Sequence, residues 1–301
     1  MEKEIIKLVE RKGPLKGSEI HETLGGDSIV LWQTCQRSTN LKIRNVGTHY
    51  LRLDPRIRGF ARLSPSIWRE FLTYSVVGIA EDPIAIERKA KEVLFNVEQV
   101  SKAKLELAYR VVAGISGHIE SLSPSDYQVC FIIAGDIVHN MAHDVLRPEK
   151  STRRLVSGSD IDLVVIADDQ APDDLMKRLD DAIFQEKYSL LMTPHVNEEI
   201  DYIVKKLERV REQVRFETFK QMVACKILHE GTLLYGSEVL FNAVKNILRQ
   251  TGVSDKLNDL ERQAKTFRRD VEAYLLRESP ERIRGEMLDL FYPSEESEEF
   301  E

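Results

Sequence analysis

Residues 158–166, with the sequence GSDIDLVVI, place two acidic side chains at the start of an apolar run. Such a run is typical of a buried strand, in which residues two apart point to the same face of the sheet. Asp160 and Asp162 would then share one face, while Ile161 and Leu163 point to the other. Two neighbouring carboxylates repel each other unless a cation lies between them. Because hard oxygen ligands favour Mg²⁺ or Mn²⁺, the pair predicts a divalent metal site. A turn whose polar residues only satisfy backbone donors is the alternative.

The chain around this pair predicts alternating strands and helices. Runs of strand-forming residues indicate strands over 127–134, 159–166 and 199–207, with a short apolar piece at 190–193. Apolar residues at helical spacing indicate helices over 84–122, 137–145, 172–186, 216–228, 237–248 and 256–290.

The N-terminal part of the chain predicts three short helices followed by a hairpin. The first two helices end at Gly13-Pro14 and Gly25-Gly26, and Asp27 or Ser28 caps the third. Strand-forming residues then surround a turn within residues 40–53, which indicates the hairpin.

Three short helices followed by a basic hairpin resemble a winged helix-turn-helix. In that family the third helix enters the major groove of DNA and the wing contacts phosphate. Here the third helix would turn Ile29, Val30 and Trp32 inward and its polar residues outward. The resemblance implies DNA contacts by Gln33, Gln36, Arg37, Lys42 and Arg44. A small helical protein-binding module with an incidental basic face is the alternative.

The charge distribution favours a partner with negative charge at this end of the chain. The net charge is -7, yet residues 1–75 carry 13 Lys and Arg against 8 Asp and Glu. Residues 37–69 alone hold eight cations against the single acid Asp54. Such asymmetry indicates a module that faces a polyanion, attached to an acidic body.

A second resemblance comes from the segments that surround the aspartate pair. A strand that ends in Gly135, a helix, the residues 158–166 and the later segment 227–236 (ILHEGTLLYG) resemble the nucleotidyltransferase superfamily of DNA polymerase beta. In that family the paired aspartates and a third acid hold two Mg²⁺ ions, and an NTP is the substrate. The resemblance therefore implies that Asp160 and Asp162 bind both metals.

The third acid of the family opens a neighbouring strand. Asp201 is our choice for it, with Glu199 and Glu208 as alternatives. The resemblance also implies a nucleotide pocket shaped by Gly135, Asp136, Gly158 and Ser159.

The chain departs from the family pattern in one place. Family members carry Gly-Gly or Gly-Ser after the first strand, whereas this chain carries Gly135-Asp136, and 23 residues separate Asp136 from Asp160. An acid is unfavourable where a phosphate should bind, unless it caps a helix or contacts metal. The intervening residues 146–156 would form a mobile basic loop that holds a triphosphate. Its cations are Arg147, Lys150, Arg153 and Arg154.

Other candidate residues carry weaker signals. His139, His143 and Asp144 share a predicted helix, where the two histidines could form part of a zinc site, although a third ligand is not evident. Lys220 and Lys226 could face a nucleotide, or could be surface lysines. The three cysteines lie far apart in apolar contexts and predict buried thiols rather than disulfides.

These signals together predict an α+β protein with several parts. We expect a winged helix over 1–75, a connecting long helix over 76–124, a nucleotidyltransferase domain with a mixed sheet flanked by helices over 125–250, C-terminal helices over 251–292, and a disordered acidic tail over 293–301.

The predicted function is Mg²⁺-dependent transfer of a nucleoside monophosphate from NTP to a hydroxyl on protein, RNA or a small molecule, coupled to DNA binding. A DNA-binding regulator whose nucleotidyltransferase domain only senses nucleotide is the first alternative, and an antitoxin that modifies a toxin is another. Winged helices commonly bind as dimers, so we expect a homodimer.

No run approaches the roughly 18 apolar residues of a membrane span and the N-terminus does not resemble a signal peptide, so we expect no membrane association and a cytoplasmic location.

Overall fold

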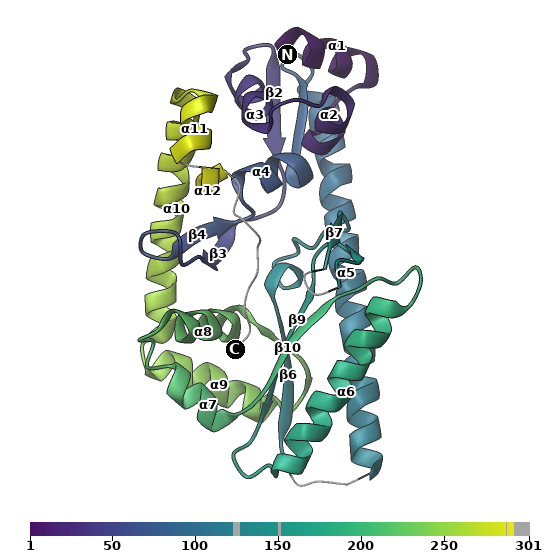
Figure 1. The fold of residues 1–301 in the computed structure, drawn as a ribbon, viewed down its shortest axis with the longest axis vertical. Helices are drawn as coiled ribbons and strands as arrows, with labels where there is room; N and C mark the ends of the chain where they lie inside the picture. The colour runs from purple at the N-terminus through teal and green to yellow at the C-terminus, as the bar shows by residue number, and fades with distance from the viewer. Residues whose placement is uncertain (123–126, 150–151, 287, 292–301) are drawn as a thin grey trace. The chain divides into compact units, whose positions relative to one another are not determined.

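The computed structural model describes residues 1–122, 127–149, 152–286 and 288–291 (Figure 1). These residues form two compact units that combine helices with small sheets, which confirms the α+β class. Unit 1 contains Met1–Val97 and the C-terminal helices from Leu260, and unit 2 contains Glu98–Asp259. The predicted acidic tail lies outside the described residues. Within the described part of the chain, no helix combines the length and apolar character needed to cross a bilayer.

Unit 1 begins with the three predicted helices. The side chain of Asp27 accepts a hydrogen bond from Val30 N at 2.9 Å and so caps the third helix as predicted. Three short strands complete this part and form an antiparallel sheet in the order β1-β5-β2. The elements are α1 (Glu2–Lys12), β1 (Leu15–Lys16), α2 (Gly17–Leu24), α3 (Ser28–Arg37), β2 (Leu41–Asn45) and β5 (Ser75–Ile79).

The predicted hairpin over 40–53 is wrong. β2 pairs with β5, whereas β3 (Tyr50–Leu53) pairs with β4 (Ala61–Ser64). The chain leaves the first sheet at Val46, whose N–H donates to Tyr74 O at 2.8 Å. The long excursion then returns through α4 (Ile67–Arg69) and a π-helical turn (Glu70–Tyr74). Consequently β5, most of which falls in the predicted connecting segment 76–124, is the central strand of the N-terminal sheet.

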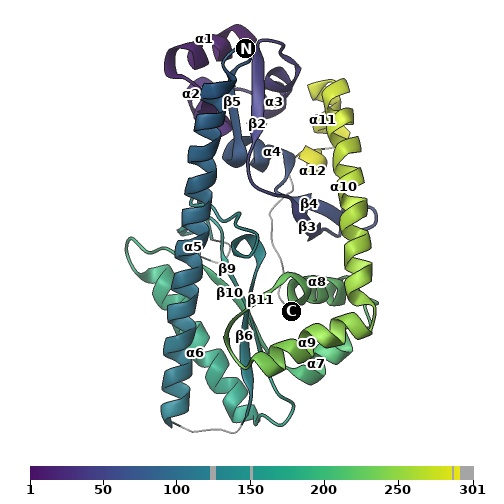
Figure 2. The same ribbon diagram turned by 180° about the vertical axis from the view of Figure 1, so that it is seen from behind.

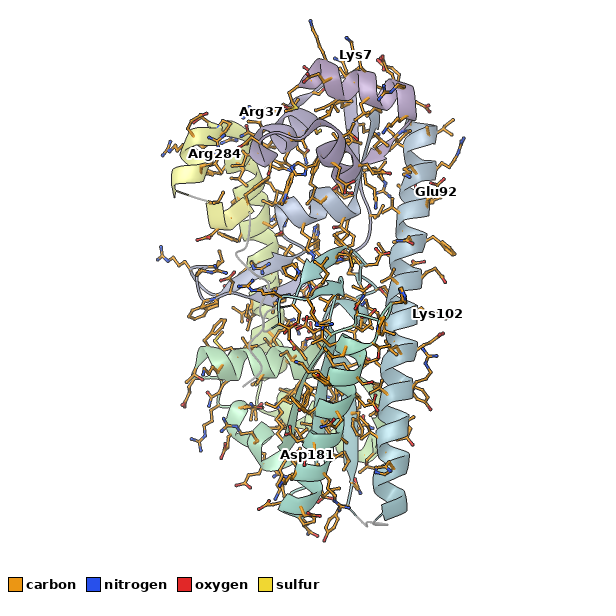
Figure 3. The ribbon with its side chains drawn as sticks, turned by 45° about the vertical axis from the view of Figure 1, so that its right-hand side comes forward. Lys7, Arg37, Glu92, Lys102, Asp181 and Arg284 are labelled. Atoms are coloured by element: carbon orange, nitrogen blue, oxygen red, sulfur yellow. The ribbon has the colours of Figure 1, made fainter. Side chains whose placement is uncertain are left out.

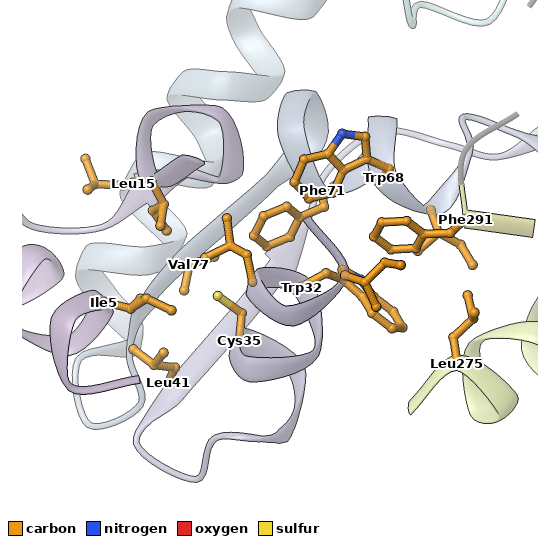
Figure 4. Packing of buried hydrophobic residues seen from close by; sticks show 14 of the residues in the cluster. Ile5, Leu15, Trp32, Cys35, Leu41, Trp68, Phe71, Val77, Leu275 and Phe291 are labelled. Atoms are coloured by element: carbon orange, nitrogen blue, oxygen red, sulfur yellow. The ribbon is translucent and has the colours of Figure 1, made fainter. Parts of the chain in front are cut away.

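An aromatic core holds unit 1 together (Figure 4). The rings of Trp32 and Phe291 lie 5.5 Å apart edge to face, and those of Trp68 and Phe71 stack at the same distance. Leu275 belongs to the same cluster, so the C-terminal helices complete the core of the N-terminal part. These helices are α10 (Val253–Arg277), α11 (Pro280–Glu286) and α12 (Leu288–Phe291), where a single helical stretch over 256–290 was predicted.

The long helix predicted over 84–122 is confirmed as α5 (Pro83–Leu122). Glu92 and Lys102 are among its exposed polar residues, and they lie on the outer side of the helix (Figure 3). Within unit 2 its apolar residues Ala108, Val112 and Ile115 pack on one face of the sheet.

Unit 2 is built on a four-stranded mixed sheet in the order β10-β9-β6-β11. β9 and β10 are parallel and the other pairs are antiparallel. Helices α5 and α6 cover one face, and α7, α8 and α9 lie on the other side (Figures 1 and 2). The elements are β6 (Val129–Ala134), β9 (Ile161–Ala167), α6 (Asp173–Met192), β10 (Ile200–Lys206), α7 (Leu207–Gln213), α8 (Phe219–Glu230), β11 (Thr232–Gly236) and α9 (Glu238–Gln250).

The helix predicted over 137–145 is wrong. A single 3-10 turn (Gly135–Ile137) follows β6, and the chain then runs irregularly to residue 145. Asn140 has a φ of 53° and Met141 N bonds back to Asp136 O, so the backbone turns instead of continuing as a helix. The two candidate zinc histidines therefore do not share a helix face. The apolar piece at 190–193 is also not separate, because α6 continues to Met192.

Candidate metal-binding site

The pairing of β9 with β10 brings four carboxylates to one face of the sheet. The two strands are parallel, and Asp201 lies opposite Asp162. Since side chains alternate along a strand, Asp160, Asp162, Glu199 and Asp201 all point away from the face that carries Ile161. Asp160, Glu199 and Asp201 each place an oxygen within 4.8 Å of the other two. Asp201 therefore lies close enough to Asp160 to share a metal ion with it.

Asp162 lies directly beside this group. It is 9% exposed and pairs in register with Ala134 of β6. Its Oδ2 lies against Gly135, where an added Cβ would be only 1.9 Å away. Gly135 also has a φ of +70°, a conformation that other residues rarely adopt. The glycine that ends β6 thus makes room for the second aspartate of the pair.

Two cations accompany the three clustered acids. Arg147 places Nη2 at 2.9 Å from Glu199 Oε2 and at 3.3 Å from Asp160 Oδ2. Its Nε donates a hydrogen bond to Gly158 O at 2.7 Å. On the other side of the group, Lys187 of α6 lies 3.1 Å from Asp201 Oδ1. Neither cation was assigned to the metal site by the sequence prediction.

The electrostatics of the group favour a bound cation. Burial raises the pKa of Asp160, and the charges of Asp201 and Asp136 raise it further, against the opposing effect of Arg147. Burial likewise raises the pKa of Glu199, with Arg147 opposing and the two aspartates adding to the rise. Ionised carboxylates so close together are stabilised by positive charge, and three oxygen donors suit a hard divalent ion.

The predicted nucleotide-pocket residues form the edge of this site. Ser159 is 2% exposed, and its hydroxyl donates to Asp136 Oδ2. Ser159 also exchanges two hydrogen bonds with the backbone of His143, at 3.0 and 3.2 Å. Gly158 has a φ of +63°, and an added Cβ would lie 1.8 Å from His143 O. Gly158 and Ser159 thus fasten the irregular segment after β6 to the start of β9.

The predicted basic loop is a two-stranded hairpin. β7 (Leu146–Pro148) pairs with β8 (Leu155–Ser157) and presents Arg147 to the acids. Arg153 and Arg154 are exposed, and Lys150 lies outside the described residues. From α5, Lys104 donates to Ser157 O at 2.7 Å and forms an ion pair with Glu198. This buried lysine fixes the end of β8 beside the start of β10.

Glu208, an alternative third ligand, lies elsewhere. β10 runs from Ile200, which pairs with Ile161, to Lys206, which pairs with Ala167. Glu208 is exposed in α7, beyond the far end of this strand. The assignment of Glu208 as third acid is therefore wrong, whereas Glu199 is one of the clustered acids.

Two of the remaining candidates of unit 2, Lys226 and His139, contact Glu230. Lys226 is 3% exposed and lies 2.8 Å from Glu230 Oε1, and His139 lies 3.0 Å from Oε2. The same carboxylate accepts a hydrogen bond from Gly135 N at 3.3 Å. Lys220 is exposed on α8. The group around Glu230 ties the end of α8 to the end of β6.

The predicted DNA-contacting residues of unit 1 divide into two sets. The prediction that Gln33 faces outward is wrong, because Gln33 is 3% exposed and donates to Leu275 O at 2.6 Å and Glu278 O at 3.0 Å. Arg37 donates to Leu276 O at 2.9 Å. Both residues thus donate to carbonyls in the last turn of α10 or just after it, where a helix leaves its carbonyls without a helical partner.

The second set is exposed, as is Arg37. Its members are Gln36, Lys42 and Arg44, although Arg44 also pairs with Glu87 at 3.2 Å. Two other cations of the basic segment, Arg52 and Arg62, lie opposite each other in β3 and β4 and are 8% exposed. The basic stretch of the sequence is therefore partly internal.

Comparison with known proteins assigns no family to this arrangement. No protein-family model matches the chain, and no curated protein resembles it significantly in sequence.

Proposed function

We propose that unit 2 is a metal-dependent nucleotidyltransferase that transfers a nucleoside monophosphate from NTP to a hydroxyl acceptor. The observation that carries the proposal is the meeting of Asp160, Glu199 and Asp201 within 4.8 Å, on two parallel strands of a mixed sheet. Mg²⁺ or Mn²⁺ fits such an oxygen donor set.

The acids have separate roles in this proposal. Asp160, Glu199 and Asp201 hold the divalent ion, and Asp162, which faces Gly135, completes the acidic edge for a second one. When bound, such ions lower the pKa of the attacking hydroxyl and neutralise the departing pyrophosphate. The chain itself orients the acids, since β9 and β10 fix their backbones in register.

The residues predicted to shape the nucleotide pocket support this site by holding its strands in position more than by binding phosphate. These residues are Gly135, Asp136, Gly158 and Ser159. Gly135 N donates to Glu230, and Asp136 accepts from Ser159. Both groups therefore already have partners, and Asp136 adds negative charge near Asp160. In our proposal the phosphates of the nucleotide are held by cations at the acidic edge, and Gly158 and Ser159 keep β9 in place.

The test is incubation of the protein with each labelled NTP, Mg²⁺ and candidate acceptors, the protein itself included. We expect transfer of label by the wild type, and a loss of at least about a hundredfold in Asp160→Asn and Asp201→Asn, the scale on which metal-held charge stabilises a transition state. Asp181→Asn is the matched control, because Asp181 is exposed on α6 (Figure 3). Transfer that persists in both site variants would refute the assignment of these acids.

A nucleotide-responsive DNA-binding regulator is the second candidate function, and the topology of unit 1 favours it. The element order α1-β1-α2-α3-β2, with β5 returning between β1 and β2 in the sheet, resembles the arrangement of a winged helix, with residues 46–74 as an enlarged wing. Lys42 and Arg44 project from β2, an edge strand of that sheet. We therefore propose β2, rather than α3, whose Gln33 and Arg37 donate to carbonyls of α10, as the phosphate-contacting element.

DNA binding at several salt concentrations tests this second function. Each lost phosphate contact should reduce the salt slope by about one and weaken binding to all sequences alike. Lys42→Ala should show this effect, whereas Lys7→Ala on exposed α1 should not (Figure 3). If the chain binds NTP and DNA but transfers no label, the regulator function is supported. If it binds no DNA, the regulator function is refuted.

A further inference from the structure

The group of carboxylates at the start of β9 and β10 contains a cation of its own. The Arg147 guanidinium lies between Asp160 and Glu199, at 3.3 and 2.9 Å. These are two of the three acids whose oxygens would ligate a divalent ion. The guanidinium and the ion therefore compete for the same two carboxylates, and both cannot be held at full strength.

The contact with Glu199 is maintained by charge alone. Among the described residues, Nη2 of Arg147 and Oε2 of Glu199 are buried atoms that make no hydrogen bond of acceptable geometry, although they lie 2.9 Å apart. A charge-assisted hydrogen bond would add directional strength that this pair lacks. The guanidinium is thus a counter-ion that a better-fitting cation can replace.

The same planar guanidinium also donates a hydrogen bond to the backbone, through Nε. Nε of Arg147 donates to Gly158 O at 2.7 Å, and Lys104 fixes Ser157 at the end of the partner strand. Nη2 of Arg147 lies between the two acids, at 3.3 Å from Asp160 Oδ2 and 2.9 Å from Glu199 Oε2. Rotation about the Cγ–Cδ and Cδ–Nε bonds would release the Nη2 contacts and redirect Nε–H together, while the backbone of the hairpin stays in place.

We propose that Arg147 is an exchangeable counter-ion: a divalent metal displaces its guanidinium from Asp160 and Glu199, and the released guanidinium then binds the phosphates of the nucleotide. This inference rests on the proposed function and adds a positioning residue and a form of regulation to it. The planar guanidinium presents paired donors that suit phosphate oxygens. Metal binding would thereby prepare the site for the triphosphate.

The proposal predicts effects of opposite sign on two ligands, which a merely structural residue would not produce. Arg147→Gln removes the charge and keeps a donor for Gly158 O. It should tighten Mn²⁺ binding about tenfold, since a partly exposed ion pair no longer competes for the acids. It should weaken binding of inorganic tripolyphosphate in saturating Mg²⁺ by about tenfold, because that ligand tests phosphate recognition without a base.

Two variants serve as controls. Arg147→Lys keeps the charge and should stay within about threefold of the wild type for Mn²⁺. Lys102→Gln removes a charge from an exposed position of α5 within unit 2 and should change neither affinity. Mn²⁺ affinity is measured by electron paramagnetic resonance and tripolyphosphate affinity by calorimetry, both on the full chain. In the wild type, the Nε–H signal of Arg147 should also shift on addition of Mg²⁺.

The outcomes separate this inference from the proposed function. If neither the wild type nor Arg147→Gln binds Mn²⁺, the metal site and the inference fail together. If both bind Mn²⁺ equally well, or the Nε–H signal stays unchanged at saturating Mg²⁺, only the exchange is refuted. If Arg147→Lys, which keeps the charge, also binds Mn²⁺ more tightly than the wild type, the effect comes from packing and the role of charge is refuted.

Discussion

Replacing Gly158 by alanine tests whether the close approach of two backbone segments holds the candidate site together. An added Cβ would lie 1.8 Å from His143 O and 2.5 Å from His143 C. These are backbone atoms, so the segment itself must move. By contrast, a Cβ on Gly135 would meet the carboxylate of Asp162, a side chain that can rotate. Gly158 is therefore the more demanding of the two positions.

The expected cost follows from two effects. The φ of +63° at residue 158 costs an alanine about 1–2 kcal/mol relative to glycine. Moving His143 O away also breaks its 3.0 Å hydrogen bond with Ser159 N, which contributes about 1 kcal/mol. Unit 2 should therefore lose about 3 kcal/mol of stability, which corresponds to roughly a hundredfold rise in the population of the open state.

Hydrogen exchange of the β9 amides is the suitable assay. The chain has two tryptophans, Trp32 and Trp68, and both lie in unit 1, so tryptophan fluorescence would not report on unit 2. Exchange of the buried strand follows the opening of unit 2 itself. Gly114→Ala is the matched control: Gly114 lies in α5 with nothing within 4 Å of an added Cβ, and alanine should stabilise the helix by about 0.5–1 kcal/mol. Exchange in Gly158→Ala within threefold of the wild type would refute the reasoning.

Three further predictions concern other buried polar groups. Burial lowers the pKa of Lys205 to about 8, so the unfolded chain binds an extra proton between about pH 8 and its ordinary pKa of 10.5, and stability of unit 2 should rise with pH across that window. Lys205→Met should abolish this rise in stability, measured by the protection of unit 2 amides from hydrogen exchange across the same pH window, and an unchanged rise would contradict the assignment. Burial raises the pKa of each cysteine thiol to about 12, so a thiol reagent at pH 8 should label the native protein far more slowly than the unfolded chain. Gln33→Leu should cost unit 1 about 1–3 kcal/mol in urea unfolding followed by tryptophan fluorescence, because Leu275 O and Glu278 O lose their buried donor. A loss below about 0.5 kcal/mol would show that water replaces the amide.

The parts of the site that follow from local periodicity could be predicted from the sequence. Alternation along a strand places Asp160 with Asp162, and the same rule places Glu199 with Asp201. The choice of Asp201 required only that the two strands be neighbours. The doublet Glu198-Glu199 before β10 was the available signal for a further acid, and Glu199 was considered only as an alternative ligand.

The parts that depend on distant partners could not be predicted. β2 pairs with β5 across the excursion of residues 46–74, and no local pattern distinguishes this from a hairpin with β3. Gln33 is polar and lies at an apparently solvent-facing helical position, yet its partners are 242 and 245 residues away. Arg147 was recognised as a cation of a basic segment, but its partners depend on the β7–β8 hairpin. In each case, contacts with residues distant in the sequence determine where the residue or strand lies.

The apolar face of the sheet determines the geometry of the acidic one. Ile161, Leu163 and Ile200 are each about 1% exposed beneath α5 and α6. If β10 slipped by one residue against β9, its acids would enter this core and Ile200 would leave it. Unpaired carboxylates in an apolar core are costly, so such a slip is strongly disfavoured. A slip of two residues would keep the faces but separate Glu199 from Asp160, which Arg147 now joins. Core packing therefore selects the face, and the arginine contact favours one register on it, so the spacing of the acids follows from how the sheet is packed.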